Sequence, residues 1–210
     1  MYIYHSHQIH NFVIITWVLK FLKVTVMEDL SLHILDIAEN SIAAGAGKIK
    51  IKIIEDTKKN FLTIEIADNG KGMDKDAVRK AYDPFFTTKT VRRVGLGVPL
   101  LAQAARESNG SISIVSKKDR GTTITANFQH NHIDRKPLGA IEKTLAVLIV
   151  ANPELDFLYE HRRNKHVYSL DTVKIKKKLG KIPINDPKAI KFIKDGISKW
   201  LNDTKSIIVL

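Results

Sequence analysis

Two segments of alternating apolar and polar residues constrain the fold of this chain more than any other feature. In residues 48–55 and again in residues 61–67, Ile or Leu recurs at nearly every second position. This period of two predicts β-strands that bury one face. Because only the polar residues 56–60 separate the two segments, we expect them to pair as an antiparallel hairpin.

Helical patterns surround this hairpin. Leu30, Ile34 and Ile37 recur at helical spacing, with Asp29 or Ser31 as the expected N-cap. We also expect a short helix at 74–81 and a longer one at 99–108. A second hairpin is expected with strands at 111–115 and 122–128. The pattern predicts an α/β two-layer sandwich with a mixed, mostly antiparallel sheet and helices on one face.

Residues 137–210 carry a further α/β pattern, which we interpret as a small C-terminal extension. The expected elements are a helix from Ile141 to Asn152, a hairpin with strands at 155–161 and 165–170, a short helix ending at Gly180 and an amphipathic helix that starts at 185–187. We expect a docking element that covers the sheet or presents a partner surface. The predicted organisation is an N-terminal extension at 1–26, a main domain at 27–136 and an accessory subdomain at 137–210.

The N-terminal extension has an apolar stretch at residues 12–26. It is shorter than the ~20 residues needed to span a bilayer, contains two lysines and lacks the layout of a secretory signal. Three interpretations of this extension are open. It packs on the domain as an added strand or helix, it serves as an interfacial or partner-binding segment, or it lies upstream of a true start at Met27. We expect no transmembrane segment and a cytoplasmic protein.

Composition narrows the chemistry. The chain has no cysteine, which excludes disulfides, thiolate zinc sites and cysteine nucleophiles. Its net charge of +12 favours anionic partners. The lysines at 174–178 alternate with Val173, Ile175 and Leu179, which is typical of the solvated face of a short helix, and no aromatic residues interleave. Nucleic acid is therefore not the expected partner.

Two glycine pairs stand at predicted element boundaries: Gly70 and Gly72 follow a predicted strand, and Gly95 and Gly97 open a predicted helix after a polar, loop-like stretch. The second pair is not a dinucleotide fingerprint, because Leu100 stands where the third glycine belongs. Residues 42–49 are not a P-loop either, because Ile42 and Ile49 replace its leading glycine and its Ser/Thr.

Taken together, five ordered blocks resemble the GHKL superfamily of gyrase, heat-shock chaperone, histidine kinase and mismatch-repair ATPase domains. The blocks are 36–41, 68–73, 83–89, 95–97 and 121–123. The resemblance implies a Bergerat-type ATP-binding fold with ATP and Mg²⁺ as cofactors. It assigns cofactor binding to Asn40, Asp68, Gly70, Gly72, Met73, Lys89, Gly95, Leu96, Gly97 and Thr122.

Several of these assignments also have a physical basis. The amide oxygen of Asn40 suits Mg²⁺, which prefers hard oxygen ligands. The carboxylate of Asp68 is suited to accept from the exocyclic amine of adenine. Gly95 and Gly97 precede a helix whose N-terminal N–H groups favour phosphate. The resemblance also implies that Asp36, one turn before Asn40, is the general base, although many relatives carry Glu there.

None of the eight histidines is followed by Asp or Glu, as a phosphoacceptor histidine normally is. We interpret His33 as a core histidine, and we expect the chain not to be a complete autophosphorylating sensor. The expected function is a regulatory protein kinase or ATPase that acts on a separate protein partner. A noncatalytic, nucleotide-gated interaction module is the alternative, and a homodimer is left open.

Overall fold

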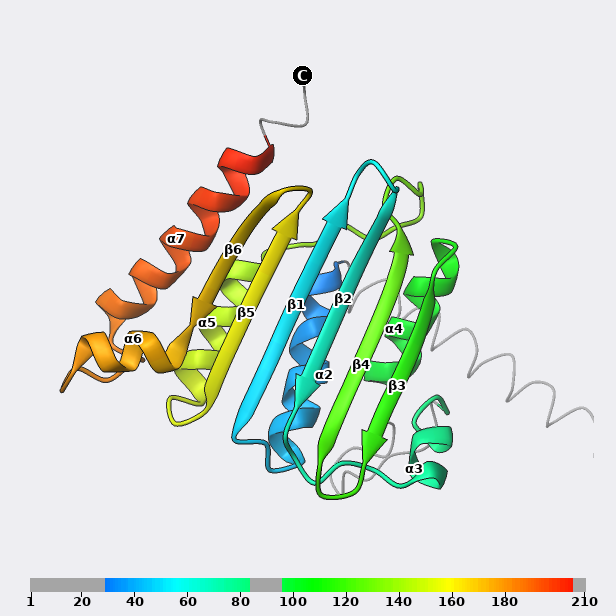
Figure 1. Cartoon of the computed structure of the whole chain (residues 1–210), viewed down its shortest axis with the longest axis horizontal. Helices are drawn as coiled ribbons and strands as arrows, with labels where there is room; N and C mark the ends of the chain where they lie inside the picture. The colour runs from blue at the N-terminus through cyan, green and yellow to red at the C-terminus, as the bar shows by residue number, and fades with distance from the viewer. Residues whose placement is uncertain (1–28, 84–95, 206–210) are drawn as a thin grey trace, which may run out of the picture.

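The structure is a computed structural model that describes residues 29–83 and 96–205, and it shows one six-stranded sheet with a layer of helices (Figure 1). The strand order is β3-β4-β2-β1-β5-β6. The strands are β1 (Lys48–Asp56), β2 (Phe61–Asp68), β3 (Ser111–Lys117), β4 (Gly121–Gln129), β5 (Asp156–Arg163) and β6 (His166–Asp171). Because β1 and β5 run parallel and the other neighbours antiparallel, the predicted mixed sheet is confirmed.

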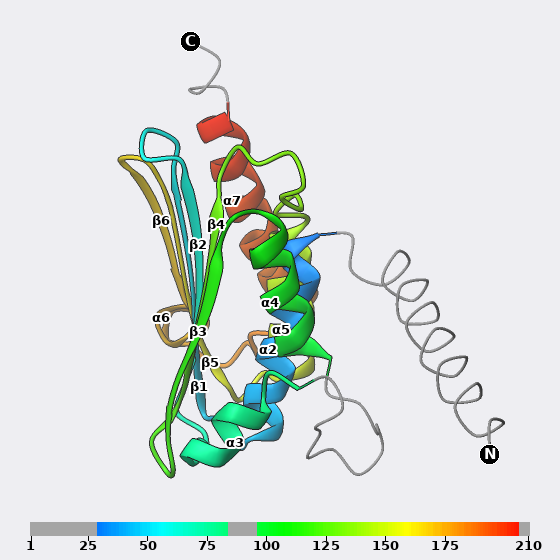
Figure 2. The same cartoon turned by 90° about the vertical axis from the view of Figure 1, so that its right-hand side faces the viewer.

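The helices are α2 (Leu30–Ala43), α3 (Lys75–Lys80), α4 (Gly97–Glu107), α5 (Ile141–Ala151), α6 (Thr172–Leu179) and α7 (Pro187–Lys205). Figure 2 shows α2, α4, α5 and α7 together on one side of the sheet, which confirms the predicted two-layer sandwich. Asp29 is the N-cap of α2, and its side chain accepts from the Leu32 N–H. Helix α4 starts two residues earlier than predicted, because Pro99 is compatible with the first helical turn.

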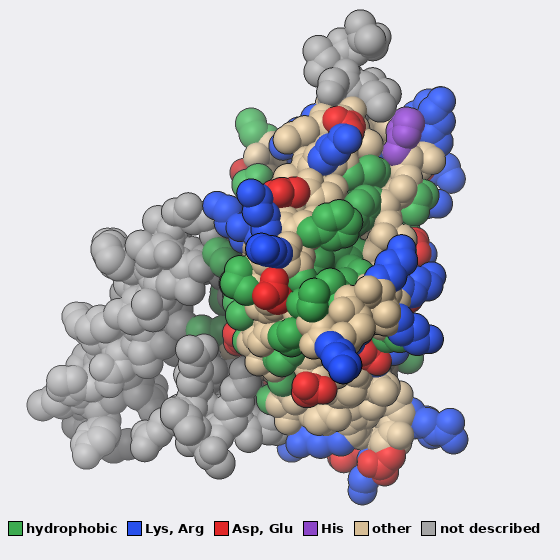
Figure 3. All heavy atoms as spheres, turned by 90° about the vertical axis from the view of Figure 1, so that its left-hand side faces the viewer, with side chains coloured by type: hydrophobic (Ala, Val, Ile, Leu, Met, Phe, Trp, Pro, Cys, Tyr) green, Lys and Arg blue, Asp and Glu red, His purple; other side chains and the backbone are tan. Residues whose placement is uncertain are grey.

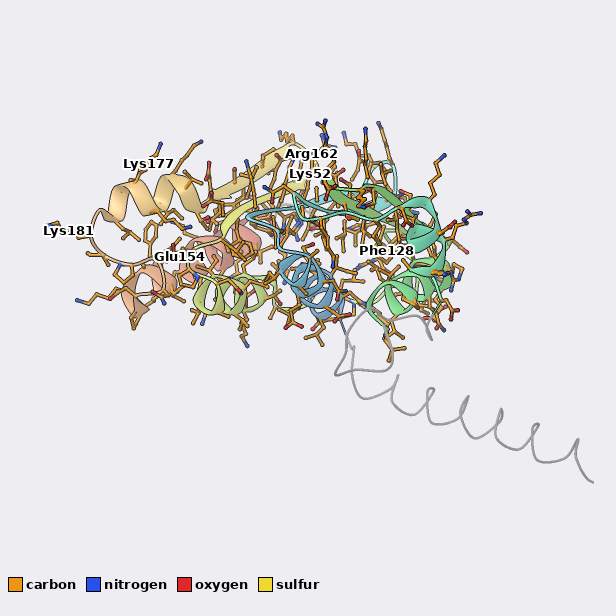
Figure 4. All side chains as sticks on the ribbon, turned by 90° about the horizontal axis from the view of Figure 1, so that it is seen from below. Lys52, Phe128, Glu154, Arg162, Lys177 and Lys181 are labelled. Carbon is orange, nitrogen blue, oxygen red and sulfur yellow. The ribbon has the colours of Figure 1, made fainter. Side chains whose placement is uncertain are left out.

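Alternation along the strands separates the core from the solvated face. Ile49, Ile51 and Ile53 of β1 are fully buried beneath the helix layer. The intervening Lys52 lies on the other face, where it forms an ion pair with Glu160 at 3.5 Å. Figure 4 shows Lys52 and Arg162 on the side away from the helices. The open face is therefore solvated, and the core lies entirely between sheet and helices.

The C-terminal residues continue this core. Strand β5 pairs with β1 in parallel over eight residue pairs, from Lys48↔Asp156 to Glu55↔Arg163. Helix α5 packs between α2 and α7. Phe157 and Tyr159 belong to the same hydrophobic cluster as the isoleucines of β1. Residues 137–205 therefore widen the sheet by two strands, and their helices α5 and α7 join the helix layer that covers one face of it.

Some sequence-based expectations concern residues outside the described ranges, namely the N-terminal extension, Lys89 and Gly95. Within the part of the chain that the structure describes, no helix has the length and apolar character needed to cross a membrane.

Candidate nucleotide-binding site

A cavity of about 510 Å³ lies where α2, α3, the start of α4, the end of β2 and the start of β4 converge. Figure 1 shows this end of β2 and β4 at the lower end of the sheet. This volume is in the range of small-molecule sites. The lining residues are Ile37, Asn40, Ser41, Ala43, Ala44, Asp68, Lys71, Gly72, Met73, Asp74, Ala77, Ala81, Gly97, Val98, Lys118, Asp119, Thr122 and Ile124.

Six of the residues assigned from the sequence line this one cavity. They are Asn40, Asp68, Gly72, Met73, Gly97 and Thr122. Three others lie beside it: Gly70 donates to Asp68, Leu96 immediately precedes α4, and Asp36 lies against Gly97. The folding of the chain thus brings four of the five sequence blocks together, from positions up to 86 residues apart (Asp36 to Thr122).

Asp68 ends β2 and is held by three hydrogen bonds. Its Oδ1 accepts from the Gly70 N–H at 2.8 Å and from the Thr122 N–H at 3.3 Å. Its Oδ2 accepts from the Ser41 hydroxyl at 2.8 Å. All three donors are neutral groups, so they orient the carboxylate without neutralising its charge. It remains an acceptor at the wall of the cavity.

The loop after β2 lies against the β3–β4 turn and forms hydrogen bonds with it. Gly72 has φ +63°, and a Cβ there would fall 2.0 Å from the Lys117 carbonyl oxygen. The Asp119 N–H donates to the Lys71 carbonyl at 2.6 Å, and the Met73 N–H donates to the Ser116 hydroxyl at 2.7 Å. Glycine is required at position 72 because both the positive φ and the close backbone approach exclude a side chain.

At the other end of the cavity, α2 meets the start of α4. A Cβ at Gly97 would fall 2.0 Å from Asp36 Oδ2 and 3.3 Å from Asn40 Nδ2. Leu96, the N-cap of α4, makes no side-chain capping bond. The N-terminal N–H groups of α4 and the Asn40 amide therefore lie together, which is a suitable arrangement for phosphate oxygens and a magnesium ion.

The chemistry of these donors fits Mg²⁺ better than a transition metal. Mg²⁺ is usually held by one or two protein oxygens together with substrate phosphates. Asn40 supplies such an oxygen, and the carboxylate of Asp36 lies one helical turn away. Within residues 29–83 and 96–205, no group of three or more His, Asp or Glu side chains forms a metal centre of its own.

Sequence reasoning missed five polar residues that line the cavity: Ser41, Lys71, Asp74, Lys118 and Asp119. Ser41 follows Asn40 and joins α2 to Asp68, and Lys71 and Lys118 place two cations at the cavity wall. Lys71 lies between the two glycines of its block, and Lys118 lies in the turn before Gly121. Position within the conspicuous blocks was a usable signal for Ser41 and Lys71, whereas Lys118 has no such signal.

The comparisons with known proteins agree with this geometry. The family described as Histidine kinase-, DNA gyrase B-, and HSP90-like ATPase matches residues 25–132, just over half of the chain. Over 112 residues the chain is 29% identical to a putative sensor histidine kinase NtrY-like of Rickettsia prowazekii, covering 53% of this chain and 18% of the relative.

A second relative is the tetrathionate sensor histidine kinase TtrS of Salmonella typhimurium, with 32% identity over 94 residues, 43% of this chain and 16% of the relative. The chain thus spans less than a fifth of the length of these curated relatives. A solved structure, the N-terminal domain of a DNA repair protein, aligns with 72% of this chain and 54% of its own at a TM-score of 0.49 and 18% identity. The family match shows that this chain belongs to the histidine kinase-, DNA gyrase B- and HSP90-like ATPases.

Proposed function

We propose that this chain binds ATP with Mg²⁺ in the cavity between α2, α4 and the β3–β4 turn, and transfers the γ-phosphoryl group to a side chain of a separate protein. The observation that carries the proposal is the single cavity that joins Asp68 and Thr122 to Asn40 and Gly97. A base-recognising end and a phosphate-binding end therefore share one continuous space.

At the first end, Asp68 accepts from the exocyclic amine of adenine. Gly70, Thr122 and Ser41 hold its carboxylate in place before the nucleotide arrives. A guanine base presents a carbonyl at the same position, so two acceptors would face each other. The buried hydrogen bond lost in that case accounts for a preference for ATP over GTP.

At the second end, Asn40 supplies the protein oxygen for Mg²⁺, and the start of α4 binds phosphate oxygens. Bound Mg²⁺ supplies charge neutralisation during phosphoryl transfer. Asp36 is the proposed general base: it accepts the proton of the attacking side chain of the partner. That side chain forms a bond to the γ-phosphorus while the bond from the γ-phosphorus to the bridging oxygen breaks and ADP leaves. Lys89, which lies outside the described residues, is proposed to contact the phosphates.

The nucleotide part of the proposal is tested by calorimetric titration with ATP and with GTP, with and without Mg²⁺. Asn40→Ala is expected to weaken ATP binding in Mg²⁺ and to have little effect in its absence. Asn185→Ala is the matched control, because Asn185 is an exposed asparagine that does not line the cavity. No ATP binding by the wild-type chain, or equal effects of the two substitutions, would contradict the proposal.

The phosphoryl-transfer part is tested with γ-labelled ATP, incubated with the chain alone and with candidate partner proteins. Labelled protein or released phosphate is expected with the wild type and is lost in Asp36→Asn. Glu39→Gln is the matched control, since Glu39 is an exposed carboxylate on the same helix. Equal loss in both variants, or transfer that survives Asp36→Asn, would remove Asp36 from the reaction.

A second candidate function, a noncatalytic nucleotide-gated interaction module, is favoured by the position of Asp36. Its Oδ2 lies against Gly97 and is not part of the cavity wall. Asp is also one methylene shorter than Glu, which limits the reach of its carboxylate. ATP binding that persists without any turnover, in the wild type and in Asp36→Asn alike, would identify the module.

A further inference from the structure

The far edge of the sheet carries a concentration of lysines that the nucleotide site does not use. Residues 172–205 contain ten lysines, three aspartates and no arginine, a net charge of +7. We name as the lysine corner α6, residues 180–186 and the first two turns of α7. Figure 1 shows this corner beyond β6, and Figure 4 shows Lys177 and Lys181 at the outer end of the molecule.

Several contacts attach the lysine corner to the rest of the fold. Asp171 caps α6 by accepting from the N–H groups of Val173 and Lys174. The Lys176 ammonium donates to the carbonyls of Glu154 and Leu155 and to Asp156 Oδ1 at 3.0 Å. Ile184 and Ile193 are buried in the shared core. One lysine and two isoleucines therefore attach the backbone of the corner to the rest of the fold.

Five further lysines of the corner face solvent: Lys177, Lys178, Lys181, Lys188 and Lys191. Within the described ranges none of the five forms an ion pair, whereas Lys174 and Lys176 pair with Asp171 and Asp156. Their charges are not neutralised by the protein. The positive potential at this edge is available to an anionic partner.

Two large apolar side chains within the sequence of the lysine corner are also exposed. Phe192 is 75% exposed and Ile182 is 53% exposed. Figure 3, which views the molecule from the side of the corner, shows hydrophobic side chains at the surface with Lys and Arg side chains around them. Exposed apolar side chains with lysines around them are characteristic of surfaces that lie at the membrane interface.

We propose that the lysine corner binds the surface of an anionic phospholipid bilayer. Lysine carries a compact charge on a flexible stem, whereas bidentate binding of individual phosphates is typical of arginine. Residues 172–205 contain no arginine. Trp200 does not stack on nucleic-acid bases, because its ring packs 4.7 Å from that of His161 and 5.9 Å from that of Tyr168. A projecting corner whose cations are all lysines, with an exposed phenylalanine, fits a dense layer of anionic headgroups.

The experiment is co-sedimentation of the full chain with vesicles of equal parts phosphatidylcholine and phosphatidylglycerol, and with vesicles of phosphatidylcholine alone. The wild type is expected to bind only the anionic vesicles. Raising the salt concentration from about 0.1 M to about 1 M, which shortens the Debye length from about 10 Å to about 3 Å, is expected to release it.

The variant Lys177→Glu/Lys178→Glu is expected to bind the anionic vesicles about thirtyfold more weakly or worse, since each lysine near the surface contributes about 1 kcal/mol. The matched control is Lys58→Glu/Lys59→Glu, an exposed lysine pair in the β1–β2 turn with the same change of charge. It is expected to weaken binding by less than about threefold, because its charges lie away from the corner. Circular dichroism checks that both variants fold.

Phe192→Ser tests the apolar contact and is expected to weaken vesicle binding about tenfold with unchanged salt dependence. Equal weakening by the two lysine-pair variants, or equal binding to both vesicle types, would overturn the proposal. So would displacement from the vesicles by double-stranded DNA or polyglutamate at equal charge concentration, which would assign the corner to a nucleic acid or an acidic protein. ATP affinity is unchanged in every variant, so failure here leaves the nucleotide site untouched.

Discussion

Two carboxylates lie at opposite ends of the β1–β2 hairpin and serve different purposes. Asp68, at the end of β2, accepts only from neutral donors and lines the cavity. Glu55, near the end of β1, accepts from His161 Nε2 at 2.7 Å and from Arg163 Nη2 at 2.7 Å. A carboxylate oriented by neutral groups keeps its charge for a ligand, whereas one paired with a cation is committed to structure.

The Glu55 cluster attaches α7 to the sheet. Arg163 Nη1 donates to Thr204 Oγ1 at 2.8 Å and to the Leu201 carbonyl at 3.2 Å. Burial alone would raise the pKa of Glu55, but the hydrogen bonds and charges of His161 and Arg163 outweigh it and hold the pKa at about 2. Burial lowers the pKa of His161, against an opposing effect of its hydrogen bond to Glu55, and Nδ1 of the ring lies 2.8 Å from the Tyr159 hydroxyl oxygen.

The largest expected effect comes from removing the structural carboxylate. Glu55→Ala leaves Arg163 buried without its counter-charge and is expected to lower the free energy of unfolding by about 3–5 kcal/mol, measured by urea denaturation. Glu160→Ala removes the partner of Lys52 on the open face and is expected to cost less than about 1 kcal/mol. Equal costs, or a lost ATP affinity in folded Glu55→Ala, would break the comparison.

A pH dependence follows from His33, a buried histidine on α2 whose ring nitrogens have no hydrogen-bond partner among the described residues. Burial, with a smaller contribution from Lys136, lowers the pKa of His33 from 6.5 to about 4, against an opposing effect of Asp29. The unfolded chain therefore binds a proton between pH 6.5 and about 4 that the folded chain does not. Stability is fully present above pH 6.5 and falls by about 3 kcal/mol as the pH drops to 4.

Urea denaturation at a series of pH values measures this dependence. In His33→Leu the loss of stability between pH 6.5 and 4 is expected to shrink markedly. The contribution of Glu55 has a different window: its folded pKa lies below its ordinary value of 4.5, so its stabilisation is present above pH 4.5 and is lost as the pH falls toward 2. An unchanged pH profile in His33→Leu would contradict the assignment.

The next largest effect is expected at the nucleotide site, where Asp68 is the counterpart of Glu55. Asp68→Asn keeps the shape of the side chain but removes its charge and places an amide donor where an acceptor is required. ATP affinity is expected to fall about 100-fold in calorimetric titration, with a small change in stability. Asp134→Asn, an exposed aspartate in the segment after β4, is the control. A large loss of stability without loss of affinity would make Asp68 a structural residue like Glu55.

The smallest expected effect concerns the residue that orients Asp68. Ser41→Ala removes the hydrogen bond from the Ser41 hydroxyl to Asp68 Oδ2. The loss of about 1 kcal/mol corresponds to an ATP affinity about fivefold lower. Ser198→Ala on α7 is a matched serine substitution away from the cavity. An unchanged affinity in Ser41→Ala would show that Gly70 and Thr122 suffice to hold the carboxylate.

Local patterns predicted most of the elements but not all of their neighbours. The alternation in β1 and β2 predicted both strands and their hairpin, because the burial of one face determines the period within each strand. The parallel pairing of β1 with β5 was not predictable, since no local pattern states which strand edge a distant segment will join. That pairing places Glu55 opposite Arg163, 108 positions away.

The amino-acid sequence by itself determined the periodicity of helices and strands, the glycines that permit close backbone approach, and the ordered blocks that indicate a nucleotide site. These are local properties, because hydrophobic period and backbone freedom act over a few residues. Only the tertiary structure decided that Ser41 orients Asp68, that Asp36 lies against Gly97, and that Glu55 pairs with Arg163. Such contacts join residues far apart in the chain, so they exist only once the sheet register and helix packing bring them together.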